Sequence, residues 1–474
     1  MSETVGVVGA GTMGAGIAQV AVAAGHPVRI ADAVPGAAAR AVDAIRGRIK
    51  TQVARGRYTV DPDKLDLIPV ETVSGLAGCD VVVEAIVEDL AVKRALFAEL
   101  EAVLAPDAVL ASNTSSLSPT ALAAGLRHPG RLVGLHFFNP VPAMRLVEVI
   151  SGLATDPAVA DAAAGLATAW GKTVVRSAAT PGFIVNRVAR PFYAEAWRLL
   201  EEHAAPAEVI DAVLTGAGGF RMGPFALMDL IGHDVNEAVT RSVWASFGYD
   251  PRFAPALAQR GLVEAGWLGR KAGRGVYPAD GAPAPVPAAP AAAPESDTGE
   301  HTAPRPGDLL ELPSGARLTV SEGLTASSLA ATSQRPVIVA DRLFDPETAS
   351  AIAIARSDGC PDAAVAEAVG LLQAAGLDVY VIEDTPGLIV TRTVAMLANL
   401  AFDALAGRVA SEPDIDTAMR LGVNYPQGPL AWGRQWGTRT LLTILDALED
   451  WYRDGHYRAS PLLRRTAVTA TVTG

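Results

Sequence analysis

The first 180 residues alternate short apolar runs with longer amphipathic stretches. The apolar runs predict buried strands, and the stretches between them have the spacing of helices, as over 15–24 and 87–104. This alternation is typical of an α/β domain with a doubly wound, mostly parallel sheet. The predicted strands are Val5–Val8, Val28–Ala31, Asp80–Ile86, Ala108–Ser112, Leu132–Leu135, Leu146–Ile150 and Lys172–Val175.

Beyond Pro181 the pattern changes to long amphipathic stretches, which predict helices over 185–203, 206–214 and 224–247. A later segment is rich in alanine and proline, cannot build a core and is predicted to be an extended linker. The expected organisation is a 1–180 α/β domain, a 181–279 helical domain, a 280–308 linker, a degenerate 309–383 α/β segment and a 384–474 helical domain.

The two helical domains repeat one another in sequence. The motif TPGFIVNR at 180–187 recurs as TPGLIVTR at 385–392, an offset of 205 positions (385 minus 180). The same offset pairs Asp211 with Asp416 and Gly223 with Gly428. One offset held over this length indicates that the helical domain is duplicated.

A glycine-rich turn follows the first predicted strand. Gly9, Gly11 and Gly14 have the spacing G-x-G-x-x-G before a predicted helix, and the next strand ends at Asp32. This order of elements is typical of a dinucleotide site in a Rossmann fold, with the acid on the ribose 2′-hydroxyl. Because no cation follows Asp32, the sequence predicts NAD rather than NADP. The loop expected to hold the pyrophosphate comprises Gly9, Gly11, Thr12, Met13 and Gly14.

Charge and composition exclude several classes of protein. The formal net charge of −12 argues against a nucleic-acid partner. No uncharged apolar stretch is long enough to cross a membrane, and the first strand leaves no room for a signal peptide, so we expect neither. Cys79 and Cys360 lack the spacing of metal ligands. No metal is therefore expected, and the cysteines are predicted to be buried thiols in the cytoplasm.

Four polar residues stand out as candidates for chemistry: Ser115, His136, Glu148 and Asn186. Oxidation of an alcohol needs a base with a pKa near neutrality, for which histidine is the default, and a carboxylate can orient its far nitrogen. Each residue also has a structural alternative. His136 could be a structural hydrogen bonder, Glu148 a solvent-facing charge, Asn186 a helix cap and Ser115 a turn residue.

Longer motifs give residues 3–277 a family resemblance. They are SNTSSL at 112–117, GLHFFNPVP at 134–142, LVEVI at 146–150, TPGFIVNR at 180–187 and GRKAGRGVY at 269–277. With these motifs the chain resembles the L-3-hydroxyacyl-CoA dehydrogenase family. The resemblance implies a Rossmann domain followed by an all-α domain of the 6-phosphogluconate dehydrogenase C-terminal type. It also implies NAD-dependent oxidation of (S)-3-hydroxyacyl-CoA to 3-oxoacyl-CoA.

The resemblance further implies roles for single residues. His136 is expected to be the general base, Glu148 to orient it, and Ser115 and Asn186 to contact the oxygens of the substrate. Besides the glycine loop, the expected cofactor contacts are Asp32, Glu88, Lys93, Asn113, Ser115, Asn139 and Lys271.

The phosphates of an acyl-CoA substrate need cations. Arg46 and Lys50 are spaced i, i+4, share one helix face and are predicted to bind the substrate, with a solvated face as the alternative. Family members often carry a serine one turn earlier, where this chain has Ala44. The local basic cluster comprises Arg46, Arg48, Lys50, Arg55 and Arg57.

The C-terminal half departs from the family where function would lie. Thr391 replaces Asn186, and 341–346 is a degenerate counterpart of the histidine motif. One NAD site per chain is therefore predicted, with the two helical domains packing within the chain; a homo-oligomer stays open. The layout resembles longer bacterial members acting on 3-hydroxyadipyl-CoA or 3-hydroxybutyryl-CoA in phenylacetate and butyrate pathways. Two alternatives remain: a related dehydrogenase of a free hydroxy acid, and a structural or NAD-sensing protein.

Overall fold

The computed structural model describes residues 3–294 and 302–469. The chain divides into two compact units. The first comprises Met1–Val185 with Arg408–Val423, and the second comprises Asn186–Gly407 with Asn424–Gly474. None of the helices in the described part combines the length and apolar character that a membrane crossing requires.

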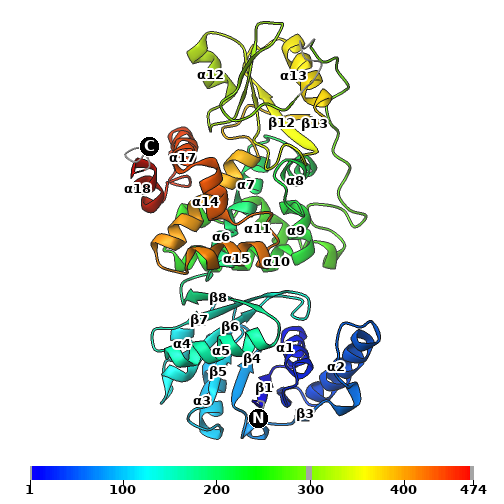
Figure 1. The fold of residues 1–474 in the computed structure, drawn as a ribbon, viewed down its shortest axis with the longest axis vertical. Helices are drawn as coiled ribbons and strands as arrows, with labels where there is room; N and C mark the ends of the chain where they lie inside the picture. Colours follow the sequence, from blue (N-terminus) through cyan, green and yellow to red (C-terminus); the bar gives the residue numbers. More distant parts are fainter. Residues whose placement is uncertain (1–2, 295–301, 470–474) are drawn as a thin grey trace. The chain divides into compact units, whose positions relative to one another are not determined.

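The first unit is built on an eight-stranded sheet of order β3-β2-β1-β4-β5-β6-β7-β8 (Figure 1). All neighbouring strands pair in parallel except β6 and β7. The predicted α/β alternation is confirmed, and β3 is an additional edge strand. The strands are β1 (Val5–Val8), β2 (Val28–Ala31), β3 (Leu67–Val70), β4 (Val81–Glu84), β5 (Val109–Ser112), β6 (Leu132–Phe137), β7 (Leu146–Ser151) and β8 (Thr173–Ala178).

Helices cover both faces of this sheet, which explains why its central strands read as continuous apolar runs. On one face, side chains of α1, α2 and α5 share a core with Val5 and Val7. On the other face, α3 and α4 pack with Val8 and Val82. The helices are α1 (Thr12–Ala23), α2 (Ala37–Ala54), α3 (Leu90–Val103), α4 (Pro119–Ala123) and α5 (Pro157–Ala169).

A helix from much later in the chain also belongs to the first unit. α15 (Glu412–Gly422) packs on β7 and β8, and the amide of Ala178 donates to the carbonyl of Val409 at 2.7 Å. At Gly422 the backbone approaches the sheet closely, because an added Cβ would lie 2.8 Å from Leu146 Cδ2 and 3.0 Å from Val185 Cγ2. The second helical domain therefore completes the unit that holds the glycine turn.

The second unit contains a smaller sheet of order β13-β12-β11-β10-β9, with α12 (Ala326–Ser333) and α13 (Asp362–Ala374). β10–β11 and β12–β13 are parallel pairs, and the other two pairs are antiparallel. α8 (Ala207–Gly216) of the first helical domain packs on β12, much as α15 packs on β7. The strands are β9 (Leu309–Glu311), β10 (Arg317–Val320), β11 (Val337–Ala340), β12 (Ala351–Arg356) and β13 (Asp378–Val381).

Two predicted helices are interrupted in the structure. The stretch 185–203 forms α6 (Val185–Val188) and α7 (Arg190–Glu201). The stretch 224–247 forms α9 (Pro224–Ile231) and α10 (His233–Ser246), separated by Gly232 with φ 104°. The remaining helices of the second unit are α11 (Leu257–Glu264), α14 (Val390–Ala406), α16 (Pro429–Trp436), α17 (Thr438–Tyr452) and α18 (Pro461–Thr469).

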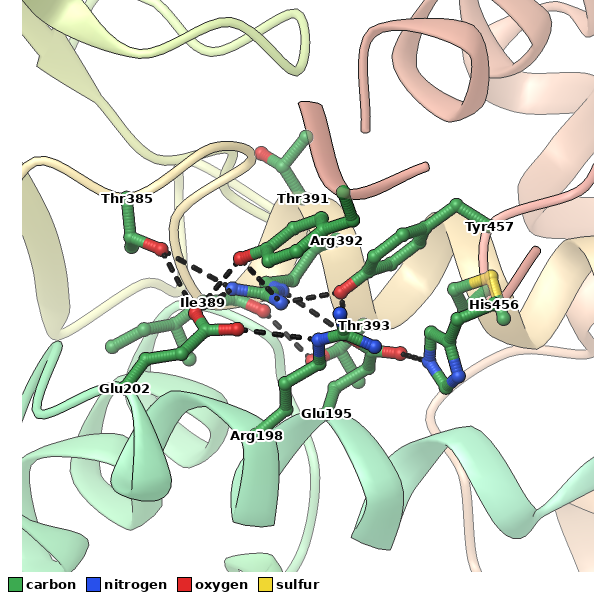
Figure 2. A network of polar contacts seen from close by, with 12 residues as sticks. Glu195, Arg198, Glu202, Thr385, Ile389, Thr391, Arg392, Thr393, His456 and Tyr457 are labelled. Carbon is green, nitrogen blue, oxygen red and sulfur yellow. Dashed lines mark hydrogen bonds and ion pairs between the residues drawn. The ribbon is translucent and has the colours of Figure 1, made fainter. Parts of the chain in front are cut away.

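A buried polar network joins the two helical domains, where α7 packs on α14 (Figure 2). The fully buried guanidinium of Arg392 lies 3.0 Å from Glu195 Oε2 and 3.2 Å from Glu202 Oε2. Glu195 also accepts hydrogen bonds from the Tyr457 hydroxyl at 2.8 Å and from His456 Nε2 at 2.7 Å. The two helical domains, which were predicted to pack within the chain, thus contact one another through α7 and α14.

The described parts of the alanine- and proline-rich segment, 280–294 and 302–308, contain neither helix nor strand. Part of this segment nevertheless lies against the small sheet. The amide of Ala288 donates to the carbonyl of Val379 at 2.7 Å, and Gln373 on α13 accepts from the amide of Ala291.

Candidate active site

The glycine turn has the geometry of a dinucleotide loop. Gly9 has φ 104°, and a Cβ there would lie 2.4 Å from the carbonyl oxygen of Ala85. A Cβ on Gly14 would lie 1.8 Å from the carbonyl oxygen of Gly9. At Gly11, by contrast, an added Cβ meets nothing within 4 Å. The turn thus leaves open space in front of the N-terminus of α1, where a pyrophosphate fits.

Asp32 lies at the end of β2, beside this turn. Its Oδ2 accepts a hydrogen bond from the amide of Ala10 at 2.6 Å, and its Oδ1 accepts from the amide of Val34 at 2.8 Å. These two bonds fix the carboxylate next to the loop. A negative charge there suits a ribose hydroxyl and opposes a 2′-phosphate.

Glu88 and Lys93 form an ion pair that orders the loop carrying Ser115. The ammonium of Lys93, with 1 % of its side chain exposed, lies 3.0 Å from Glu88 Oε2. Glu88 Oε1 accepts from the amides of Ser115 and Ser116 at 2.9 and 3.0 Å. Burial would raise the pKa of Glu88, but Lys93 and the hydrogen bonds of Thr114 and Ser116 outweigh it and lower the pKa to about 2. Glu88 is therefore a carboxylate at neutral pH.

Glu84 is a site residue to which the sequence assigned no role. It is fully buried at the end of β4, and its Oε1 lies 2.6 Å from the ammonium of Lys93. It also accepts from Ser112 Oγ at 2.6 Å and from the amide of Ile86 at 2.7 Å. The signal available in the sequence was an acid at the end of an apolar strand, whereas Glu148 was marked as an acid inside one.

His136 and Glu148 face one another across the antiparallel pair β6–β7, in which they are direct partners. Paired residues of adjacent strands point to the same side of a sheet, so the register itself brings the two side chains together. His136 Nδ1 lies 2.6 Å from Glu148 Oε2. Glu148 Oε1 accepts from the amides of Ile184 and Val185 at 3.0 and 3.1 Å.

This arrangement determines the tautomer of the imidazole. Since a carboxylate only accepts, Nδ1 of His136 carries its proton toward Glu148, and Nε2 is left with a lone pair for a substrate. The histidine side chain is 8 % exposed. Its ring lies 4.5 Å from the ring of Phe138 and 5.9 Å from that of Phe183, measured between centroids. Two hydrogen-bonded side chains in an apolar setting can therefore act as a base and its positioning group.

The structure places the other expected cofactor contacts as follows. Asn113 Oδ1 accepts from the amide of Phe137 at 2.9 Å and so joins the loop after β5 to β6. Asn139 lines a cavity of about 510 Å³ together with Gly11 and other residues of α1 and α2. In the second unit, the ammonium of Lys271 lies 2.6 Å from Asp234 Oδ1.

Asn186 lies in α6, one residue after Val185, whose amide holds Glu148. Of the cluster on α2, the guanidinium of Arg46 donates to the carbonyls of Leu65 and Leu67, both at 3.1 Å, and Lys50 is exposed. Arg48, which the sequence analysis named as a member of the basic cluster without predicting a substrate contact for it, lines the 510 Å³ cavity.

Comparison with known proteins agrees with this geometry. The family profile described as "3-hydroxyacyl-CoA dehydrogenase, NAD binding domain" matches residues 4–180, and the profile of its C-terminal domain matches 182–279 and again 387–472. A profile described as "3-hydroxybutyryl-CoA dehydrogenase reduced Rossmann-fold domain" matches residues 318–386. The chain belongs to the 3-hydroxyacyl-CoA dehydrogenase family. It is an NAD-dependent oxidoreductase of that family with a duplicated helical domain.

Individual relatives are similar over different lengths. A 3-hydroxyadipyl-CoA dehydrogenase of Escherichia coli K12 is 47 % identical over 98 % of both chains. A 3-hydroxybutyryl-CoA dehydrogenase of Bradyrhizobium diazoefficiens is 42 % identical, covering 60 % of this chain and 98 % of its own. A crystal structure of a 3-hydroxybutyryl-CoA dehydrogenase from Escherichia coli covers both chains fully, with 46 % identity and a TM-score of 0.92.

Proposed function

We propose that His136 is the general base in the oxidation of the 3-hydroxyl group of an acyl-CoA thioester and that Glu148 positions it. The observation that carries this assignment is the 2.6 Å contact between His136 Nδ1 and a Glu148 carboxylate anchored by two backbone amides. A carboxylate held in this way keeps the ring oriented and stabilises the imidazolium that forms when the base takes a proton.

In the forward direction, Nε2 of His136 takes the proton of the 3-hydroxyl group while a hydride leaves the carbon that bears this group. The glycine turn and Asp32 would hold NAD, which would supply the acceptor for that hydride. The developing imidazolium remains paired with Glu148, so its charge is compensated beside the rings of Phe138 and Phe183. Ser115, on the loop ordered by Glu88, and Asn186, which follows Val185, are proposed to contact the oxygens of the substrate.

For the acyl group, we propose a short 3-hydroxyacyl chain, with 3-hydroxyadipyl-CoA as the first candidate. Support comes from the relative of that name, which matches this chain over nearly its whole length, including the duplicated half. The test is a comparison of kcat/KM for 3-hydroxyadipyl-CoA and 3-hydroxybutyryl-CoA with NAD. A higher value for the butyryl substrate would reverse the proposed preference.

The reverse reaction distinguishes a CoA thioester from the alternative substrate class, a free hydroxy acid. The purified chain should oxidise NADH with acetoacetyl-CoA and show no comparable rate with free acetoacetate. An equal rate with both would contradict the CoA thioester as the substrate. We also propose a cytoplasmic enzyme, which is supported by the two cysteines, both free and buried.

A further inference from the structure

Arg190 is a buried arginine in the second unit, and none of the described carboxylates pairs with it. It is the first residue of α7 and only 5 % exposed. Its Nη1 donates to the hydroxyl of Thr240 at 3.0 Å, but its buried Nε lacks a hydrogen-bond partner in the described part of the chain. Burial lowers the pKa of Arg190, and two tyrosines rather than acids oppose that effect. Because an arginine keeps its charge in proteins, this cation is left uncompensated.

The two tyrosines near Arg190 can donate hydrogen bonds but carry no charge. The ring centroid of Tyr193 lies 4.9 Å from the guanidinium carbon. The ring of Tyr425 packs on Phe192, with centroids 5.6 Å apart, and its buried hydroxyl has no hydrogen-bond partner among the described residues. Burial raises the pKa of Tyr425, so this hydroxyl stays protonated. Buried polar groups are usually satisfied, so the unused donors of Arg190 and Tyr425 indicate an anionic acceptor.

A small cavity beside Arg190 does not supply that acceptor. Its volume is about 10 Å³, and Thr240 and Gln259 also line it. This is about the space of one water molecule. A water there would satisfy one more N–H of the guanidinium but would leave its charge uncompensated. The anion is therefore expected along the face of the helix that carries Arg190.

Arg190 lies about one helical turn after Asn186, on the same face. Ala189, which separates α6 from α7, has a right-handed helical backbone, so the helical path continues across it. Residues spaced i, i+4 and i+7 share a helix face, which places Asn186, Arg190 and Tyr193 in one row. Four residues of helix rise about 6 Å. Asn186 is only partly buried, so a ligand that contacts it can extend along this row to Arg190.

The duplicated helix lacks both residues of this row. The offset of 205 places Ala395 and Ala398 of α14 at the positions of Arg190 and Tyr193 (395 minus 190 and 398 minus 193). Both alanines are fully buried. The same helix therefore packs without an arginine in the half where Thr391 replaces Asn186. The arginine is not a requirement of the helical fold, which favours a role in binding.

We propose that Arg190, together with the hydroxyl of Tyr425, binds the terminal carboxylate of a dicarboxylic 3-hydroxyacyl chain. This inference rests on the proposed function, in which Asn186 contacts an oxygen of the substrate. In 3-hydroxyadipyl-CoA, three carbon–carbon bonds of about 1.5 Å each separate the carbon that bears the hydroxyl group from the terminal carboxyl carbon. With the oxygens included, this span matches about one helical turn. A 3-hydroxybutyryl chain is too short to reach the cation and has no charge to offer it.

The experiment compares 3-hydroxyadipyl-CoA with 3-hydroxyhexanoyl-CoA, which has the same number of carbons and a methyl group in place of the carboxylate. The wild type should have the higher kcat/KM for the adipyl substrate. Arg190→Met should lower that value about a hundredfold, the effect of removing one partner of a buried charge pair, and leave the hexanoyl value unchanged. Tyr425→Phe should lower it about tenfold, the effect of one hydrogen bond to a charged group.

Arg198→Met is the matched control. Arg198 lies on the same helix, but its guanidinium is paired with Glu202 and Asp454, so the ratio of the two kcat/KM values should stay that of the wild type. A second readout needs no turnover. With NAD present, calorimetry should show a higher Kd of adipyl-CoA for Arg190→Met than for Arg198→Met, and the same Kd of hexanoyl-CoA for both.

The proposal is overturned if Arg190→Met keeps the substrate ratio of the wild type, or if both substrates lose kcat/KM alike, as a purely structural role of Arg190 would cause. Should Arg190→Met fail to fold, an unchanged ratio in Tyr425→Phe overturns it instead. A chain that oxidises neither substrate but shows the difference in Kd would contradict the dehydrogenase mechanism and leave the carboxylate site standing.

Discussion

The two halves of the chain share one backbone motif and differ at the position of the proposed base. In the N-terminal half (residues 1–279), His136 on β6 faces Glu148 on β7. The offset of 205 places Asp341 and Ala353 at these positions in the C-terminal half (residues 309–474), where the amide of Asp341 bonds to the carbonyl of Ala353. The strand pairing is thus repeated, but the acid has moved from one strand to the other.

From its new position, Asp341 makes the contacts that Glu148 makes in the N-terminal half. It accepts from the amides of Ile389 and Val390 at 2.9 and 2.6 Å, and from the hydroxyl of Thr391 at 2.7 Å. The turn has the same unusual backbone in both halves, with φ 48° at Phe183 and 47° at Leu388. One carboxylate therefore anchors this turn in each half, whereas the proposed acid–base pair needs a second polar residue across the strand pair, which Ala353 does not supply.

The sharpest test of this comparison counts cofactor sites. Among the described residues of the C-terminal half, none forms a counterpart of the glycine turn at Gly9–Gly14. Calorimetric titration of the full chain should therefore give one NAD per polypeptide. Two equivalents would mean that the C-terminal half still binds a dinucleotide.

A pair of substitutions at equivalent positions should then separate the halves by activity. His136→Gln should lower kcat at least about a hundredfold, the contribution of a general base, with NAD affinity unchanged. Asp341→Asn should leave kcat per folded molecule within about twofold of the wild-type value, although it weakens the anchoring of the turn at Ile389 and Val390. Steady-state kinetics with acetoacetyl-CoA measures both. Near-normal turnover of His136→Gln would remove His136 from its proposed role.

The network between the helical domains should contribute to stability. Arg392→Met removes the guanidinium that pairs with the buried Glu195 and should lower the free energy of unfolding by about 3–5 kcal/mol. Arg464→Met is the control, because Arg464 pairs with Asp446 at the surface and should contribute at most about 1 kcal/mol. Urea unfolding compares the two variants, and equal midpoints would show that the buried network adds nothing.

The same network makes stability depend on pH. Burial would raise the pKa of Glu195, but His456 and Arg392 outweigh burial and lower it from 4.5 to about 2. A lowered carboxyl pKa stabilises the folded state above pH 4.5, and this contribution is lost as the pH falls toward 2. The stability difference between wild type and Glu195→Gln should therefore shrink over that range.

The smallest expected effect concerns the contact of α15 with β7 and β8. Gly422→Ala places a Cβ against Leu146 and Val185. Leu146 lies on the same strand as Glu148, and the amide of Val185 donates a hydrogen bond to Glu148. We expect kcat to fall about tenfold or less with little change in KM, because the ring of His136 is misplaced. Gly165→Ala, on a helix where the added Cβ meets nothing within 4 Å, is the control. Equal kcat for both variants would mean that α15 only covers the sheet.

Local patterns predicted the parts of the fold that depend on neighbouring residues. The strand runs and the glycine turn lie within short windows, the 205-residue offset is a match between two short motifs, and each has its counterpart in the structure. β3 was missed because Pro69 and polar neighbours obscure it, and proline is tolerated there because the strand lies at the sheet edge. Gly232 divides a stretch whose apolar spacing continues on both sides.

The parts that sequence did not predict depend on contacts far apart in the chain. Glu84 closes an apolar strand, as the sequence indicated, but its partner Lys93 becomes apparent only when α3 returns along β4. Likewise, no local pattern shows that α15 packs on β7 rather than with its own helical domain. The anchoring role of Asp341 was also not predicted. It becomes apparent only because Asp341 accepts from the amides of Ile389 and Val390, as Glu148 on β7 does from Ile184 and Val185.

The placement of α15 also sets an order of events during protein synthesis. The sheet that holds His136 and Glu148 ends at β8, yet α15, the helix that covers its edge, ends at Gly422, about 240 residues later. At roughly 5–20 residues per second, the ribosome needs on the order of 10 to 50 s to cover that distance. During this interval the nascent domain already contains its glycine turn and His136. The apolar edge beside Leu146, however, is not yet covered by α15. A nascent chain arrested near residue 280 would therefore present that edge to chaperones.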